Sequence, residues 1–263
     1  EHGGSPPLSV VCTGEVAIVG AGPGDPELLT LRAVRLIAAA DDLVVDALVP
    51  PEVYASSPAS VVYVGKRAGR PRPSQRRIGG ILVSLARRGR RVVRLKGGDP
   101  SVFGRLGEEV ADLEAAGIRY EVVPGVSSIQ AAAVAAGVPL TDRDLADRFI
   151  VLTGHRRSGH APVRELPAYD PEVTLVWLMP LKTLPELVDA ALEAGYPGAL
   201  PAVVVSRAST RHQAVVGATL EELLTAVEAS GLETPATVLV GRVAHRALSA
   251  ARAPAIRSLA SRA

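Results

Sequence analysis

Gly20-Ala21-Gly22-Pro23-Gly24-Asp25 and Lys96-Gly97-Gly98-Asp99-Pro100 are the two glycine-rich stretches that decide the fold. Each follows an apolar, β-branched run, at residues 16–19 and at residues 92–93. A strand that ends in a glycine-rich turn lets a ligand approach the backbone closely, because glycine has no Cβ. The two stretches together predict one small-molecule cleft at the carboxyl ends of parallel strands.

Apolar runs and helical spacings alternate outward from these turns and predict an α/β fold. Up to residue 123 strands and helices alternate, which implies a mainly parallel sheet. Thr30 is the expected N-cap of the first helix. The expected strands cover residues 15–20, 43–45, 61–64, 92–95, 120–123, 149–153, 174–178, 202–205 and 237–240, and the expected helices cover 31–40, 74–88, 108–116, 127–136, 183–194 and 219–229.

A domain boundary is expected near Pro124 to Ser128, where a strand stops at a Pro-Gly pair. This predicts an N-terminal α/β domain over residues 15–125 and a C-terminal α/β domain over residues 126–247. Residues 1–14 lack Met and a signal-peptide pattern, and we interpret them as a disordered leader or linker. Residues 248–263 are expected to be a C-terminal tail.

The composition excludes several classes of function. Hydrophobic residues make up 48% of the 263 residues and aromatic residues only 3%, which predicts an aliphatic core suited to β/α layers. The net charge of +2 is far from that of a typical nucleic-acid binder. Cys12 is the only cysteine, so neither an internal disulfide nor a cysteine-rich metal site is expected. No apolar run approaches a membrane span, and we expect a cytoplasmic protein without a membrane or nucleic-acid partner.

The first turn superficially matches the dinucleotide-binding fingerprint. Asp25 stands where that fingerprint has its third glycine, and its carboxylate has the wrong sign for a phosphate. Pro23 and Pro26 also stiffen a loop that would otherwise curl directly into a helix. A nicotinamide cofactor is therefore disfavoured, and a tight turn without any ligand stays open as an alternative.

The second turn is the denser signal. Gly97 and Gly98 expose backbone N–H and C=O groups, and Asp99 could accept from an ammonium or a hydroxyl, although Gly-Asp-Pro is also good turn chemistry. Asp46 ends an apolar strand, where a carboxylate can act as a base or simply cap a turn.

Basic residues add a second kind of signal near the third expected strand. Lys66 is one of only three lysines, with Lys96 and Lys182, in a chain that otherwise uses arginine, so its compact ammonium can matter. Chance and a solvated strand end explain it as well. Several arginines follow in the same loop, where a polyanionic small molecule could be held. They are Arg67, Arg70, Arg72, Arg76 and Arg77.

The whole pattern resembles the tetrapyrrole methylase family over about residues 15–247. The motifs that carry the resemblance occur along the whole of that length, and together they are highly specific. They include residues 19–33, 45–49, 64–69 and 92–104, Glu108 with Glu109, and residues 123–128, 139–141 and 153–155. The family implies two α/β domains of the tetrapyrrole methylase type, with S-adenosylmethionine in the cleft between them, usually in a homodimer. Within it, the motifs are most similar to those of members that methylate two ring carbons of uroporphyrinogen III to give precorrin-2.

The resemblance also implies roles for individual residues. Asp46 matches the proton acceptor and Lys66 the proton donor, while Lys66, Arg67 and Gln75 are implied to bind the tetrapyrrole substrate. No metal is implied. The implied cofactor-binding residues are Pro23, Gly97, Gly98, Asp99, Val102, Ser127, Ser128, Met179, Ala208 and Ala236.

The sequence departs from the family pattern at Val45, Gly79, Leu106, Asp142 and Pro180. Several of these positions are expected to line the tetrapyrrole pocket, and the carboxylate at position 142 would repel substrate carboxylates. Three alternatives therefore stay open. They are a methylase of the same fold acting on another corrin precursor, a nicotinamide-dependent dehydrogenase, and a binding protein that kept the cofactor cleft and lost the substrate pocket.

Overall fold

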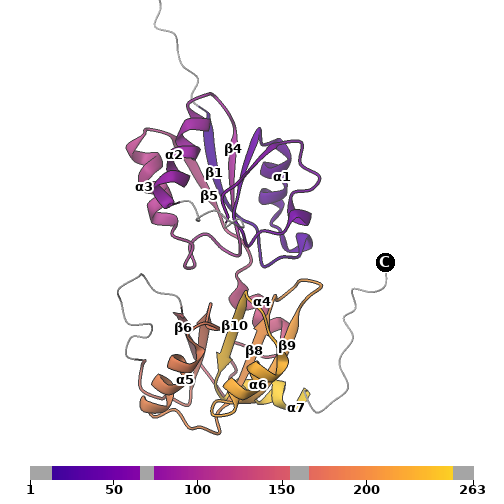
Figure 1. Cartoon of the computed structure of the whole chain (residues 1–263), viewed down its shortest axis with the longest axis vertical. Coiled ribbons are helices and arrows are strands. Elements are labelled where there is room, and N and C mark those ends of the chain that lie inside the picture. Colours follow the sequence, from indigo (N-terminus) through magenta and orange to yellow (C-terminus); the bar gives the residue numbers. More distant parts are fainter. Residues whose placement is uncertain (1–13, 66–73, 155–165, 251–263) are drawn as a thin grey trace, which may run out of the picture. The chain divides into compact units, whose positions relative to one another are not determined.

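The chain contains two compact units that meet in sequence between Val126 and Ser127. A computed structural model describes residues 14–65, 74–154 and 166–250 (Figure 1). Each unit is built around a five-stranded sheet with its own hydrophobic core. The expected leader and most of the expected tail lie outside the described residues.

The first unit holds a fully parallel sheet in the order β3-β2-β4-β1-β5. Except at Glu15, the first residue of β1, its central strands are buried along their length, which the continuous apolar runs predicted. The strands are β1 (Glu15–Gly20), β2 (Asp42–Val45), β3 (Ser60–Tyr63), β4 (Val92–Lys96) and β5 (Arg119–Val123). The predicted parallel sheet is thus confirmed for this unit.

Helices cover both faces of this sheet. Helix α1 (Leu31–Ala39) packs on one face, and α2 (Gln75–Ala86) and α3 (Leu106–Ala115) pack on the other (Figure 1). Short 3₁₀ turns follow β1 at Pro26–Leu28 and β2 at Pro51–Val53. Thr30 caps α1 as predicted, because its hydroxyl oxygen accepts a hydrogen bond of 3.1 Å from the Ala33 N–H.

The second unit holds a mixed sheet in the order β6-β7-β10-β8-β9. Only β6 and β7 run parallel, and the other three pairings are antiparallel. The strands are β6 (Arg148–Thr153), β7 (Val173–Leu178), β8 (Pro201–Ser206), β9 (Ala214–Thr219) and β10 (Ala236–Val240). The helices are α4 (Ser128–Ala135), α5 (Leu184–Glu193), α6 (Leu223–Ser230) and α7 (His245–Ala250), with a 3₁₀ turn at Arg242–Ala244.

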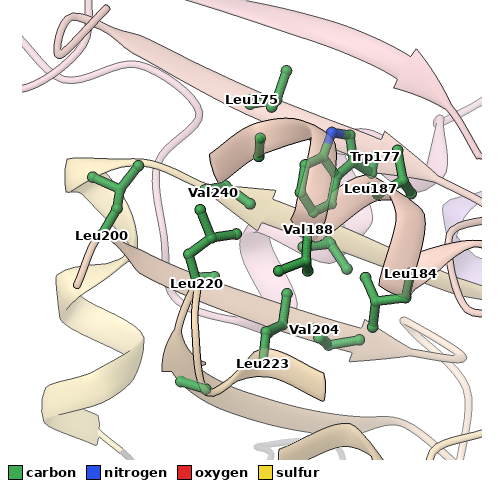
Figure 2. Packing of buried hydrophobic residues seen from close by; sticks show 14 of the residues in the cluster. Leu175, Trp177, Leu184, Leu187, Val188, Leu200, Val204, Leu220, Leu223 and Val240 are labelled. Atoms are coloured by element: carbon green, nitrogen blue, oxygen red, sulfur yellow. The ribbon is translucent and has the colours of Figure 1, made fainter. Parts of the chain in front are cut away.

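The core of the second unit surrounds Trp177, the only tryptophan of the chain (Figure 2). The same cluster contains Leu184, Leu187 and Val188 of α5 and Leu223 of α6. Such aliphatic packing around one large ring follows from a composition that is rich in Leu, Val and Ala. Among the described residues, no helix is both long enough and apolar enough to cross a membrane.

Three elements of the second unit differ from expectation. Helix α7 was not predicted, and it extends past residue 248, where the C-terminal tail was expected to begin. Strand β9 was not predicted, because it is an edge strand with exposed residues such as Val215, and its apolar run is interrupted by Gly217. Helix α6 begins at Leu223 and not at residue 219, since residues 214–219 extend the sheet first. The remaining predicted elements are present, with ends shifted by up to two residues.

Candidate active site

The two glycine-rich turns pair with each other at the carboxyl ends of β1 and β4. The Gly22 N–H donates to the Gly98 carbonyl at 3.2 Å, and the Gly98 N–H donates to the Gly22 carbonyl at 2.7 Å. Gly22 and Gly98 have φ values of +70° and +68°, a region that glycine adopts without strain. The prediction that the two turns belong together is confirmed within the first unit.

A third glycine joins this contact from the end of β5. A Cβ on Gly20 would lie 2.6 Å from the Gly125 nitrogen and 2.7 Å from the Gly98 oxygen. A Cβ on Gly125 would lie 2.4 Å from the same Gly98 oxygen. Three strand ends therefore converge at backbone distance, which leaves no room for side chains at these positions.

Asp99 holds this convergence together. Its Oδ1 accepts from the backbone N–H and the hydroxyl of Ser101 at 2.8 and 2.5 Å, and its Oδ2 accepts from the Gly125 N–H at 3.0 Å. Burial alone would raise the pKa of Asp99, but the hydrogen bonds from Ser101 and Gly125 outweigh burial and lower that pKa. Both carboxylate oxygens thus shape the turn, which is a role beyond the ligand contact expected from the sequence.

Asp25, in the first turn, accepts a hydrogen bond of 2.9 Å from the Glu27 N–H. It is the N-cap of the 3₁₀ turn Pro26–Leu28 and not the start of a long helix. The loop therefore differs from a dinucleotide-binding turn, in which the helix begins directly at the glycines.

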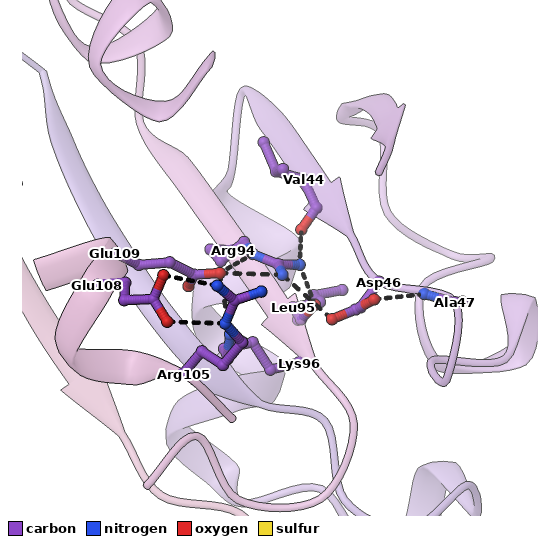
Figure 3. Close-up of polar contacts among 9 residues, drawn as sticks. All are labelled: Val44, Asp46, Ala47, Arg94, Leu95, Lys96, Arg105, Glu108 and Glu109. Carbon is purple, nitrogen blue, oxygen red and sulfur yellow. Dashed lines mark hydrogen bonds and ion pairs between the residues drawn. The ribbon is translucent and has the colours of Figure 1, made fainter. Parts of the chain in front are cut away.

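A buried cluster of charged residues lies beside these turns (Figure 3). Arg94 of β4 is fully buried, and its Nη2 lies 3.2 Å from Asp46 Oδ2 and 3.1 Å from Glu109 Oε1. Its Nη1 donates to the carbonyls of Val44 and Leu95 at 3.3 and 2.9 Å. The guanidinium therefore links the end of β2 to helix α3 across β4.

Lys96 and Glu109 complete the cluster. Glu109 is fully buried, its Oε1 accepts from the Lys96 Nζ at 2.9 Å, and its Oε2 has no hydrogen-bond partner in the described structure. Burial and the neighbouring charge of Arg94 lower the pKa of Lys96, against the opposing effect of Glu109. Sequence reasoning missed Arg94, Lys96 and Glu109 as a functional group.

A signal for this cluster was present in the sequence. Arg94 and Lys96 interrupt an otherwise apolar strand, and a charge in a buried strand needs a partner of opposite sign. Glu108 and Glu109 offered two such partners twelve to fifteen residues later. Spacing alone did not tell them apart, and only the register of α3 on the sheet selects Glu109. Glu108 instead forms a solvent-exposed pair with Arg105 at 2.7 Å.

Asp46 lies directly after β2, where its side chain is largely buried. Its Oδ1 accepts from the Ala47 N–H at 2.8 Å, and its Oδ2 faces Arg94. The carboxylate thus sits at the same carboxyl edge of the sheet as the glycine turns. Lys66 and Arg67, its expected partners in the chemistry, lie outside the described residues.

Three of the expected cofactor residues gather at one edge of the second sheet. Met179 follows β7, Ala208 follows β8 and Ala236 begins β10, which runs antiparallel to both. The register pairs Ala236 with Ser206 and Thr237 with Leu178, so all three residues lie at the same edge. Met179 has a φ of +55° and is 42% exposed, so its thioether is accessible on a strained turn.

Ser127 and Ser128 lie at the start of α4, which packs on β10 and β8. Ser127 is buried, and its hydroxyl caps the helix by accepting from the Ile129 N–H at 3.3 Å. Gln75 begins α2, and its buried Oε1 has no hydrogen-bond partner in the described structure. Pro23 and Val102 are half-buried in the two glycine turns.

Two departures from the family pattern lie in the packing of the first unit. Val45 is fully buried in the core beneath α1. Gly79 is buried where α2 crosses α3, and a Cβ there would lie 1.9 Å from an Asp112 oxygen. Helix and sheet packing thus already fill the space around Val45 and Gly79.

The other three departures have different surroundings. Leu106 is half-buried and packs against the core between α2, α3 and the sheet. Pro180 is buried in the turn after β7. Asp142 begins a short turn in which its Oδ1 accepts from the Asp144 N–H at 3.1 Å. The Asp142 carboxylate is therefore used locally.

Comparisons with a family model, with related proteins and with a solved structure all indicate the same family. The family model of tetrapyrrole (corrin/porphyrin) methylases matches residues 15–224. Siroheme synthase 1 of Halorhodospira halophila is 47% identical over 230 residues, which are 87% of this chain and 48% of that protein. The S-adenosyl-L-methionine-dependent uroporphyrinogen III methyltransferase of Arabidopsis thaliana chloroplasts is 45% identical over 88% of this chain and 63% of its own length. The chain thus spans about half of the first relative and less than two thirds of the second.

The match to a solved structure covers most of both chains. The uroporphyrin-III C-methyltransferase of Thermus thermophilus, complexed with S-adenosylhomocysteine, superposes with a TM-score of 0.75 at 41% identity. The superposition covers 88% of this chain and 93% of that one. The similarity therefore extends over both units.

Proposed function

Because this chain belongs to the tetrapyrrole methylase family, we propose that it transfers methyl groups from S-adenosylmethionine to two ring carbons of uroporphyrinogen III, giving precorrin-2. The observation that carries the proposal is the similarity over both units to proteins named for this reaction. The longer relatives hold further sequence, so the proposal concerns the methyl transfer and no other activity.

The residues of each unit fit such a cofactor. In the first unit, the glycine turns expose backbone groups where no Cβ would fit, as at Gly97, whose Cβ would lie 2.8 Å from the Leu48 Cβ. In the second unit, the small side chains of Ala208 and Ala236 share a sheet edge with the exposed Met179. Backbone acceptors, small residues and a thioether suit an adenosine and its sulfonium chain. The full proposed cofactor set is Pro23, Gly97, Gly98, Asp99, Val102, Ser127, Ser128, Met179, Ala208 and Ala236.

Asp46 is the proposed centre of the chemistry. S-adenosylmethionine supplies an electrophilic methyl group when it is bound. Methylation of a pyrrole carbon makes the macrocycle cationic, and a proton must then leave it. The Asp46 carboxylate, at the edge of the sheet, can stabilise that positive charge or accept the proton.

Lys66, Arg67 and Gln75 are the proposed contacts to the substrate. Ammonium and guanidinium groups pair well with the acetate and propionate groups that the tetrapyrrole carries. The buried amide oxygen of Gln75, which has no hydrogen-bond partner among the described residues, gives a further acceptor shortly after these residues in sequence. Lys66 is proposed as the proton donor as well.

The assembly and the cellular location are also part of the proposal. The family resemblance favours a homodimer, and the single cysteine is compatible with the cytoplasm. Sedimentation of the purified chain tests the dimer directly. A monomer at micromolar concentration would contradict it.

Turnover of uroporphyrinogen III with S-adenosylmethionine tests the function. We expect a dimethylated product, whose oxidised form is coloured and fluorescent, together with cofactor binding in calorimetry. Cofactor binding without turnover would instead indicate a family member that acts on another corrin precursor. Absence of both cofactor binding and turnover would contradict the proposal.

A further inference from the structure

Arg94 connects Asp46 to two buried charged residues that the proposed chemistry does not use. We propose that Arg94 is a positioning residue which, held in place by Glu109 and Lys96, fixes the Asp46 carboxylate for methyl transfer. The inference rests on the proposed function only in giving Asp46 a role in the chemistry.

Each nitrogen of the Arg94 guanidinium donates at least one hydrogen bond. Nε donates to Glu109 at 3.2 Å, Nη1 donates to the carbonyls of Val44 and Leu95, and Nη2 donates to Asp46 while lying 3.1 Å from Glu109. A planar guanidinium held at all three nitrogens has one orientation (Figure 3). The Asp46 Oδ2 therefore faces a fixed donor.

Charge balance explains why four residues are needed. Arg94 and Lys96 are buried cations, and Glu109 and Asp46 are the anions they meet. Arg94 alone would bring one positive charge to two carboxylates, and a buried charge without compensation is costly in a low-dielectric environment. With Lys96 on Glu109, Arg94 can engage Asp46 without leaving a buried charge unpaired.

Stability is a weak explanation for this cluster. Burying ion pairs costs desolvation that their attraction only partly offsets, and apolar residues of similar size often serve a core as well or better. Asp46 is the member of the cluster with most access to solvent, at 16% exposure of its side chain. Asp46 is therefore the carboxylate of this cluster that can contact a ligand, and the buried charges lie next to it.

The same two strands offer a matched control. Arg90 precedes β4 and pairs with Asp42 at 2.5 Å, at the amino end of β2, just as Arg94 pairs with Asp46 at its carboxyl end. Both pairs join the segment of β2 to the segment of β4. The second pair lies four residues further along each segment than the first. Only the pair at the carboxyl edge lies beside the glycine turns.

A double-mutant cycle tests the proposal. We expect Arg94→Met to lower kcat about 10- to 100-fold in the intact chain, with the cofactor Kd changed less than about threefold. In an Asp46→Asn background the same substitution should change kcat less than about twofold, because Arg94 acts through Asp46. Arg90→Met should leave kcat unchanged. Equal effects of Arg94→Met in both backgrounds would overturn the proposal.

Two further measurements test the proposal if a variant folds poorly or if the substrate is not uroporphyrinogen III. Glu109→Gln, which keeps the shape of the side chain, should also lower kcat, as Arg94→Met does. Crystal structures of the wild type and of Arg94→Lys should show the Asp46 carboxylate displaced by about 1 Å or more. An unmoved carboxylate would overturn the positioning role, whereas a wild type inactive on uroporphyrinogen III would contradict only the proposed function.

Discussion

Asp46 accepts hydrogen bonds from the Ala47 N–H and the Arg94 guanidinium, and an asparagine at this position removes the charge while keeping the shape of the side chain. We expect Asp46→Asn to lower turnover by about 10²-fold or more, because an amide neither accepts the leaving proton nor stabilises a cation as well. Cofactor affinity, measured by calorimetry, should be unchanged. Asp42→Asn, at the other end of the same strand, is the control and should retain turnover. Full activity of the Asp46 variant would remove it from the proposed role.

Asp99 links two segments of the first unit through its two oxygens, and this contact depends on pH. Asp99→Asn should lower the free energy of unfolding by about 1–3 kcal/mol at pH 7, because an amide cannot accept from both Ser101 and Gly125 without presenting a donor to one of them. The lowered pKa of Asp99 means that its carboxylate stabilises the fold above about pH 4 and loses this effect as the pH falls through the folded value.

Urea unfolding of both proteins at pH 7 and at pH 3 measures this effect. The difference in the free energy of unfolding between the wild type and Asp99→Asn should be smaller at pH 3 than at pH 7. Asp25→Asn, in the other glycine turn, is the matched control and should cost less, because the hydrogen bond by which Asp25 caps its 3₁₀ turn is exposed. The Asp99 variant should also bind S-adenosylmethionine about tenfold more weakly, since the turn around Gly98 loosens. A difference in unfolding free energy that does not change with pH would contradict the role given to the charge.

Single residues of the candidate site were only partly predictable from the sequence. Asp46 stood out because it ends an apolar strand, and Asp99 because it follows two glycines. The hydrogen bond from Gly125 to Asp99 joins residues 26 positions apart and has no local signal. Arg94 and Glu109 are complementary only once α3 has packed on the sheet, which a sequence pattern does not specify.

Helix α2 carries two neighbouring glycines with opposite surroundings. A Cβ on Gly79 would meet Asp112 of α3, including its Cβ at 2.8 Å, whereas a Cβ on Gly80 would meet nothing within 4 Å. Gly79→Ala should therefore destabilise the protein by about 1–3 kcal/mol, because α2 and α3 must move apart. Gly80→Ala should stabilise it by about 0.5–1 kcal/mol through helix propensity alone.

Thermal unfolding of the two variants gives a comparison within one helix turn. The expected melting temperatures move in opposite directions from that of the wild type. The pair Gly79→Ala with Asp112→Ala should recover part of the lost stability, since it removes the side chain in the way. Equal shifts for both glycine variants would mean that helix propensity, and not the contact with α3, decides the outcome.

Whole elements were easier to predict than contacts, for a physical reason. The central strands of the first unit are buried on both faces, so their apolar runs are continuous and their ends are marked by glycine or a charge. Strand β9 lies at an edge and is half exposed, so its sequence carries neither a continuous apolar run nor a clean alternation. The antiparallel direction of β10 also depends on which strands it pairs with, which no local pattern records.

The division into two units could be located from the Pro-Gly pair at residues 124–125, whereas the separation of their cores required the structure. One cluster surrounds Trp177, and two clusters lie on the faces of the first sheet. Because Trp177 is the only tryptophan and is fully buried, its fluorescence reports the unfolding of the second unit. Far-UV circular dichroism, in contrast, reports the helices and strands of both.

Leu187 and Leu82 are matched buried leucines, one in the core of each unit, at 1% and 0% exposure. Replacing either with alanine should cost about 2–5 kcal/mol, because the lost side chain leaves a cavity. If each core supports its own unit, Leu187→Ala lowers the urea midpoint measured by Trp177 fluorescence. Leu82→Ala then lowers the midpoint of part of the dichroism signal and leaves the fluorescence midpoint near that of the wild type. Equal fluorescence shifts for the two variants would instead show that both units unfold as one cooperative body.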